Sequence, residues 1–134
     1  MFHAEHSLVQ IIAHMLVAYL FICAGAVNAS SKLRSRQHAE HFAALGYPLP
    51  WLVLITGYGV QFTGGAMVLA DWHADIGAIA LMVFTIVAML SYHHYWRFSE
   101  PARRNTARLF FINNCGVLGG LMLIAEPALV RIGL

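Results

Sequence analysis

The chain has 134 residues, of which 60% are hydrophobic and only 10% carry a charge, and its mean hydropathy is +0.68. A soluble domain carries about 25% charged residues, so this composition excludes an ordinary soluble protein. The formal net charge is +2, and the placement of the charges along the chain is more informative than their sum.

Four long intervals contain no aspartate, glutamate, lysine or arginine. They lie between Glu5 and Lys32, Glu40 and Asp71, Asp75 and Arg97, and Arg108 and Glu126. A helix that spans a bilayer needs roughly 17–25 mostly apolar residues, and each interval is long enough. The sequence therefore predicts an all-α integral membrane four-helix bundle. Its helices are expected at about 7–29, 51–71, 75–96 and 107–126, in a single membrane domain over residues 1–134.

The basic residues predict how the bundle is oriented. Seven of the eight fall in two expected loops, as Lys32, Arg34 and Arg36 after the first helix and Arg97, Arg103, Arg104 and Arg108 around the turn before the fourth. The positive-inside rule places these loops in the cytoplasm and both termini outside a bacterial inner membrane. No cleaved signal peptide is expected, because the first residues lack a basic region.

The N-terminal region combines several histidines with a carboxylate. His3, Glu5 and His6 are expected to be solvated, with metal binding as the alternative. In the first helix, small and polar residues share one stripe that should face the bundle, namely His14, Ala18, Phe21 or Ile22, Gly25 and Asn28. His14 is interpreted as bonded to a neighbouring helix, with a haem or quinone contact as the alternative.

The segment from Ser30 to Pro50 has a helix-forming composition up to Leu45. It is predicted to be an amphipathic interfacial segment that rests Leu33, Phe42 and Leu45 on the lipid surface. His38 and His41 share a face and lie on the same membrane side as His93 and His94. These four imidazoles form either a metal or proton-handling site or a set of independent, solvated histidines.

The second and fourth helices carry stripes of small and polar residues, which favour close helix packing. The stripes are Gly57, Gln61, Gly64 and Gly65, and Asn113, Gly116 and Gly120. Gln61 is expected near the middle of the bilayer, where a buried amide needs a hydrogen-bond partner or a ligand. The outer turn from Asp71 to Asp75, together with His3 and His6, is a further metal-site alternative, but no residue is assigned as a metal ligand.

The cysteines and histidines limit the redox cofactors to be expected. Cys23 and Cys115 form no CxxC motif, so they are interpreted as buried thiols, with a bridge between them as the alternative. Bis-histidine haem ligation is not expected, because His14 and His93 should differ in depth by roughly 15 Å at 1.5 Å per residue. No CxxCH attachment motif is present either.

Three stretches resemble the DoxX family of small membrane proteins. They are LFICAGAVNASSKL in the first helix, QFTGGAMVLA in the second, and HHYW followed by FFINNCGVLGGLMLIA. Where the family pattern has a glutamate and a lysine, this chain has Gln61 and Ile112. The resemblance implies a four-helix membrane protein and a small membrane partner in a redox system, since the family is named after a subunit of a thiosulfate:quinone oxidoreductase.

Combining the residues with the resemblance, we expect a subunit that binds quinone or passes electrons to the quinone pool. The expected binding residues are His93, His94, Tyr58, Asn114 and Asn28, which gather toward the cytoplasmic side, and Gln61 near the middle of the bilayer. No catalytic residue is assigned, and whether the chain is itself an enzyme stays open. The alternatives are a structural subunit of a larger complex and a small carrier. The expected partners are the lipid bilayer and other redox subunits, but not nucleic acid.

Overall fold

The computed structural model describes residues 6–134, so the expectations for His3 and Glu5 lie outside the described residues. The described chain is helical and contains no strand, which confirms the all-α fold class. Its elements are α1 (Leu8–Ala29), α2 (Lys32–Ala44), α3 (Pro50–Leu69), α4 (Ala74–Tyr92), the short 3₁₀ helix η1 (Tyr95–Arg97) and α5 (Pro101–Arg131).

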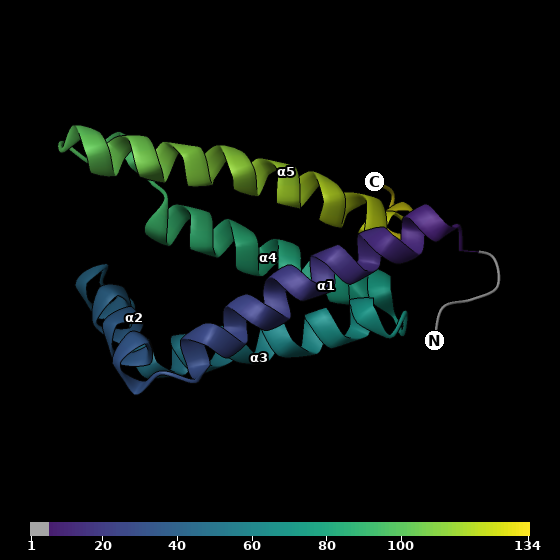
Figure 1. The fold of residues 1–134 in the computed structure, drawn as a ribbon, viewed down its shortest axis with the longest axis horizontal. Helices are drawn as coiled ribbons and strands as arrows, with labels where there is room; N and C mark the ends of the chain where they lie inside the picture. The colour runs from purple at the N-terminus through teal and green to yellow at the C-terminus, as the bar shows by residue number, and fades with distance from the viewer. Residues whose placement is uncertain (1–5) are drawn as a thin grey trace.

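Four of these elements form an elongated bundle, and α2 lies across one of its ends (Figure 1). Within the bundle, α4 packs between α3 and α5, while α1 packs mainly on α3. The opposite end holds the start of α1 and the end of α5 (Figure 1). Four helical segments of the described chain are long and apolar enough to cross a membrane, at Leu8–Ala29, Pro50–Leu69, Ala74–Arg97 and Pro101–Arg131.

The central core lies where α1, α3, α4 and α5 meet. Its buried side chains are all apolar, namely Phe21, Val68, Ala78, Leu81, Leu121 and Ala125. The backbones of α3 and α4 touch, because a Cβ added to Gly64 would lie 3.1 Å from the carbonyl oxygen of Gly77. The expected packing role of the α3 glycines is therefore confirmed.

The glycine stripe on α5 faces away from the other helices of the chain. Gly116 and Gly119 are exposed, and a Cβ added to Gly116, Gly119 or Gly120 would meet no atom within 4 Å. The stripe therefore meets no other helix within the described chain, and its packing against helices of a larger complex stays a prediction. Both α4 and α1 contact another side of α5, which buries residues such as Leu121, Ala125 and Ala128.

Two helix ends also differ from the prediction. The third predicted helix stops at Tyr92 rather than at about 96, because the chain turns through His93, His94 and η1 before α5 begins. The last helix begins at Pro101, a residue suited to the first turn of a helix, instead of at about 107. It continues to Arg131 through Pro127, so α5 is longer than its charge-free interval.

Candidate functional site

The α2 helix closes the end of the bundle from which the basic residues project. Ser31 caps its start by accepting a hydrogen bond from the Arg34 backbone N–H. Phe42 is 9% exposed and packs with Leu54, Tyr47 and Tyr92, so the expectation that it rests on lipid is wrong. The bundle buries an aromatic side chain on this face of α2 more completely than the membrane surface would. Leu33 lies on another face of α2 and stays exposed.

Hydrogen bonds join α2 to three of the spanning helices. The Ser35 hydroxyl lies 3.3 Å from the Asn28 carbonyl oxygen on α1 and 3.0 Å from the Tyr58 hydroxyl on α3. On α4, the Tyr92 hydroxyl is 2.7 Å from His38 Nδ1. Such bonds are short-range and directional, so they fix how far α2 stands from the helices beneath it.

His41 completes this attachment of α2 to α4. Its Nε2 atom donates to the Ser91 carbonyl oxygen over 2.8 Å, and its ring stacks on Tyr92 with centroids 4.2 Å apart. His38 and His41 therefore do share a face, and both are held by α4. The interpretation of these two as independent, solvated histidines is wrong.

A pocket of about 270 Å³ lies beneath α2, between α1, α3 and α4. Its walls are mostly apolar or aromatic, with a few polar groups between them. The lining residues are Asn28, His38, Phe42, Val53, Leu54, Gly57, Tyr58, Gln61, Phe84, Ala88, Tyr92 and His93. An apolar enclosure with a small number of placed polar groups is typical of small-molecule sites, although this volume is near the lower end of their range.

Three polar side chains in the pocket wall form no side-chain hydrogen bond with the described part of the chain, namely Asn28, Gln61 and His93. Gln61 is the deepest along its helix and is only 6% exposed, with its Oε1 atom near the α1 backbone at Gly25. Burying an amide without a hydrogen-bond partner destabilises the folded protein by about 1–3 kcal/mol. A ligand or water that bonds to this amide removes that penalty and is itself held more tightly. The His93 ring stacks on Phe110 of α5, with centroids 5.2 Å apart.

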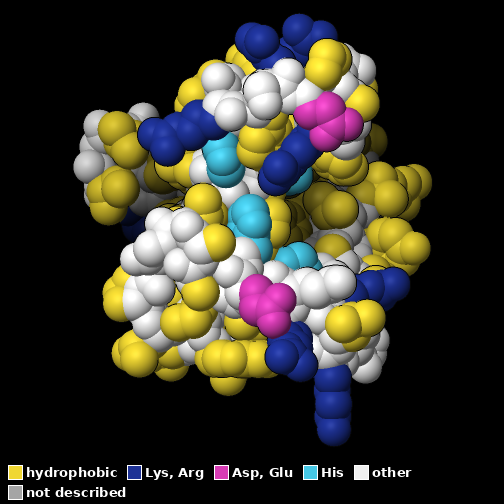
Figure 2. All heavy atoms as spheres, turned by 90° about the vertical axis from the view of Figure 1, so that its left-hand side faces the viewer, with side chains coloured by type: hydrophobic (Ala, Val, Ile, Leu, Met, Phe, Trp, Pro, Cys, Tyr) yellow, Lys and Arg dark blue, Asp and Glu magenta, His cyan; other side chains and the backbone are white. Residues whose placement is uncertain are grey.

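The end of the molecule over the pocket is basic at its edge. Figure 2 shows this end, with histidine side chains toward the middle of the face and lysine and arginine side chains around it. The pKa of His38 is lowered from its ordinary value, first because burial penalises the charged ring and second because His41 is close. At neutral pH His38 is therefore neutral and suited to its hydrogen bond with Tyr92.

The pocket brings together four of the six residues expected to bind a ligand, namely Asn28, Tyr58, Gln61 and His93. The other two lie elsewhere. His94 lines a separate cavity of about 250 Å³ with Tyr47, Trp96 and Arg97. Asn114 is half-buried on α5, a helix that contributes no residue to the pocket.

Sequence reasoning did not name two lining residues, His38 and Tyr92, as binding residues. The signal for His38 was its spacing from His41, which places both on one helical face. Tyr92 had no comparable signal, because its contact with α2 spans more than fifty positions of the sequence.

An apolar groove of about 360 Å³ continues from the pocket along α3 and α4. It shares Val53, Gly57 and Phe84 with the pocket, and its other lining residues are Leu52, Thr56, Val60, Ala80, Val83 and Val87. Several of them, such as Leu52 and Val83, are exposed on the outside of the bundle. The groove therefore connects the pocket with the surface that faces lipid.

The two cysteines are separate and free in the structure. Cys23 is half-buried on α1, whereas Cys115 is exposed on α5. The two thiols form no bridge, and the expectation of burial is wrong for Cys115, which lies on the outward side of α5.

Comparison with known proteins agrees with this architecture. The sequence model of the DoxX family matches residues 9–94, which include α1 to α4 but not α5. The chain is also similar to the inner membrane protein YqjF of Escherichia coli (strain K12), with 26% identity over 115 residues, covering 86% of this chain and 80% of that protein. No solved structure matches.

Proposed function

Because this chain belongs to the DoxX family and is a multi-pass protein of the inner membrane, we propose that it binds a quinone headgroup beneath α2 as a subunit of a membrane redox system. The observation that carries this proposal is the Gln61 amide. It faces a lipophilic pocket inside the bundle and has no hydrogen-bond partner among the described side chains.

The pocket suits the chemistry of a quinone. A quinone ring is flat, apolar on its faces and hydrogen-bonding at its two carbonyl oxygens. Aromatic walls from Phe84, Tyr58 and Tyr92 enclose the ring. The amides of Gln61 and Asn28 donate to one carbonyl, and His93, at the end of α4, exchanges protons at the other.

The groove along α3 and α4 accommodates an apolar tail. The pocket of about 270 Å³ has room for a headgroup, and the shared wall at Gly57 and Phe84 opens into the groove. Gly57 has no side chain to narrow this passage. A Cβ there would lie 3.4 Å from the Phe84 ring, which is contact distance, and would fill the space between them. The tail then stays among residues that face lipid while the headgroup remains inside.

The proposal divides the reaction between this chain and a partner. Reduction of a quinone to a quinol takes up two electrons and two protons. The chain supplies the binding site and the proton-exchanging His93, and a redox partner supplies the electrons. The basic α2 end faces the cytoplasm by the positive-inside rule, so the protons come from that side.

Binding of ubiquinone-1 to the purified protein in nanodiscs tests the proposal. Each hydrogen bond contributes about 1 kcal/mol, so His93→Phe should raise the dissociation constant about fivefold. His94→Phe is the matched control, because His94 lines the neighbouring cavity and its replacement should leave binding unchanged. Equal effects of the two changes, or no saturable binding to the native protein, would contradict the proposed site.

A second candidate, a structural subunit without a quinone site, is favoured by the outward face of α5. Asn113 and Gly116 are exposed there, although polar and small residues make poor lipid contacts. This face suits a further membrane helix of a larger complex. Absence of quinone binding, with co-purification of membrane subunits that depends on Gly116, would support this candidate.

A further inference from the structure

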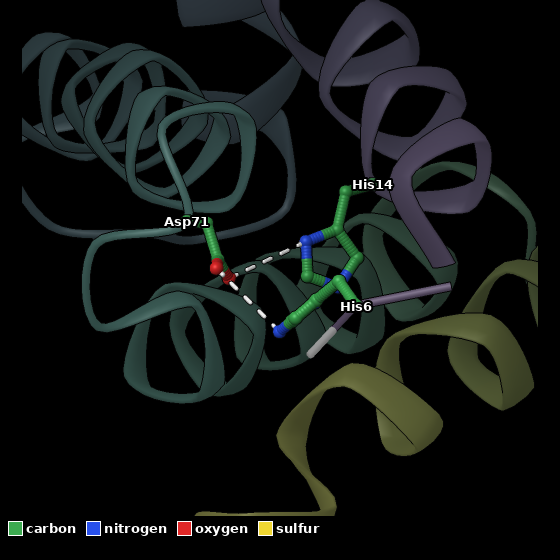
Figure 3. A group of neighbouring side chains, drawn as sticks. All are labelled: His6, His14 and Asp71. Atoms are coloured by element: carbon green, nitrogen blue, oxygen red, sulfur yellow. Dashed lines mark ion pairs between the residues drawn. The ribbon is translucent and has the colours of Figure 1, made fainter. Parts of the chain in front are cut away.

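The geometry points to a binding site for a divalent transition-metal ion of the Zn²⁺ class at the other end of the bundle, formed by His6, His14 and Asp71. Their ligand atoms all lie within 4.8 Å of one another. Figure 3 shows both imidazoles directed at the Asp71 carboxylate. This site is separate from the pocket beneath α2, so it does not depend on the proposed quinone function.

Three different segments hold the three side chains in place. His6 directly precedes Ser7, whose side chain caps α1 in a reciprocal capping box with Gln10. His14 follows two turns later on the buried stripe of α1. Asp71 lies in the turn after α3. The arrangement therefore depends on the packing of α1 against α3.

The distances fit ligands around an ion better than direct hydrogen bonds. His6 Nε2 is 3.5 Å from Asp71 Oδ2, and His14 Nδ1 is 3.7 Å from Asp71 Oδ1. A direct N–H···O bond would bring these atoms to about 2.7–3.2 Å. Ligands at about 2.0–2.1 Å around a tetrahedral ion are separated by roughly 3.3–3.4 Å. The two nitrogen–oxygen distances are slightly longer than this and the whole set lies within 4.8 Å, so the side chains would draw together around an ion.

The Asp71 carboxylate is buried beside the two imidazoles. Its side chain is only 6% exposed, and that of His14 is 8% exposed. Removal of an ionised carboxylate from water is costly unless a cation or strong hydrogen bonds compensate. A divalent ion compensates the charge directly, and two neutral imidazoles complete its coordination.

The backbone at Asp71 is also unusual. The N–H groups of Asp71 and Trp72 bond to the carbonyl oxygens of Val68 and Met67, which is the Schellman pattern that ends a helix. Asp71 occupies the left-handed position of this motif, with φ 51°. Glycine is the favoured residue there, and aspartate is one of the few other residues that adopt this conformation readily.

The donor set defines the kind of ion. Two imidazole nitrogens and one carboxylate oxygen suit Zn²⁺ and related transition ions, whereas Mg²⁺ and Ca²⁺ prefer oxygen ligands throughout. Three protein ligands leave a fourth position for water, as in zinc sites that are open to a further ligand.

The test measures Zn²⁺ affinity by competition with a chromophoric chelator, using detergent-purified full-length protein without a histidine tag. The native protein should bind one Zn²⁺ per chain at this site, in the presence of excess Mg²⁺. Loss of a group that merely supports a ligand costs roughly 10–100-fold in affinity. Asp71→Asn and His6→Ala should therefore each weaken binding at least tenfold.

His73→Asn is the matched control, because His73 is an exposed histidine of the same turn with a similar left-handed backbone, φ 49°. It should leave the affinity unchanged. His6→Ala removes a half-buried side chain ahead of the first helix, so it keeps the test valid if Asp71→Asn disturbs folding. Absence of saturable Zn²⁺ binding, or equal affinity of the native and His6→Ala proteins, would overturn the proposal.

Discussion

The contact between α3 and α4 predicts how strongly a single methyl group at Gly64 destabilises the bundle. A Cβ at Gly64 would lie 2.9 Å from Leu81 Cγ and 3.1 Å from the Gly77 carbonyl oxygen. Atoms that close must move apart, and overpacking of this kind costs about 1–3 kcal/mol. Gly64→Ala also gains roughly 0.5–1 kcal/mol, because alanine favours a helix over glycine.

The control for this prediction lies on the same helix. A Cβ at Gly59 would meet no atom within 4 Å. Gly59→Ala therefore gains the stability that alanine gives a helix, without a steric clash. Both variants gain the same helix propensity from alanine, so the clash alone should make Gly64→Ala less stable than Gly59→Ala by about 1–3 kcal/mol. The same reasoning predicts that Gly116→Ala behaves like Gly59→Ala.

Reversible unfolding in mixed detergent micelles, followed by far-ultraviolet circular dichroism, measures these differences. If Gly64→Ala is as stable as Gly59→Ala, the close approach of α3 and α4 is not a feature of the folded protein. If Gly116→Ala is destabilised as strongly as Gly64→Ala, the outward orientation of the α5 stripe is wrong.

Three further predictions concern the two ends of the molecule. In a cysteine-free background, Gln37→Cys should react with a membrane-impermeant reagent only from the cytoplasmic side and Trp72→Cys only from the outside, and the reverse pattern would contradict the topology. Because the pKa of His38 is lowered in the folded protein, its contribution to stability is complete above about pH 6.5 and is lost as the pH falls through the lower folded-state pKa. His38→Phe should therefore make the melting temperature less sensitive to acid. An unchanged dependence of the melting temperature on pH would contradict this. Arg131 on α5 pairs with Asp75 on α4 at an exposed site. Arg131→Ala should therefore lower the free energy of unfolding by no more than about 1 kcal/mol. A larger decrease, measured by unfolding in micelles, would show that this pair is more than a surface ion pair.

The spanning helices could be predicted because each needs only a long apolar interval, which can be counted along the sequence. The burial of the first-helix stripe was also predictable, and His14, Ala18, Phe21 and Gly25 are all buried. The family was identified correctly as well. However, the FFINNCGVLGG motif used for that resemblance lies in α5, beyond the residues 9–94 that match the family model.

The candidate site was only partly predictable, because depth along a helix is readable from sequence but direction is not. Depth placed Asn28, Tyr58 and His93 near one membrane side and Gln61 near the middle of the bilayer, and the pocket contains all four. Nothing in the sequence indicated that α2 folds back over the bundle, and this contact creates the pocket roof. His93 and His94 were expected to point in directions about 100° apart on a continuous helix. The end of α4 at Tyr92 instead places them in two different cavities.

The central claim is that the pocket beneath α2 holds a quinone through the Gln61 amide. The most direct test is the amount of quinone that co-purifies from native membranes, measured by mass spectrometry per mole of protein. The control variant is Thr63→Val, which removes a polar group from an exposed position of the same helix. Quinone should co-purify with the native and Thr63→Val proteins and be clearly lost from Gln61→Leu. Equal quinone content in Gln61→Leu and Thr63→Val, or none in the native protein, would contradict this claim.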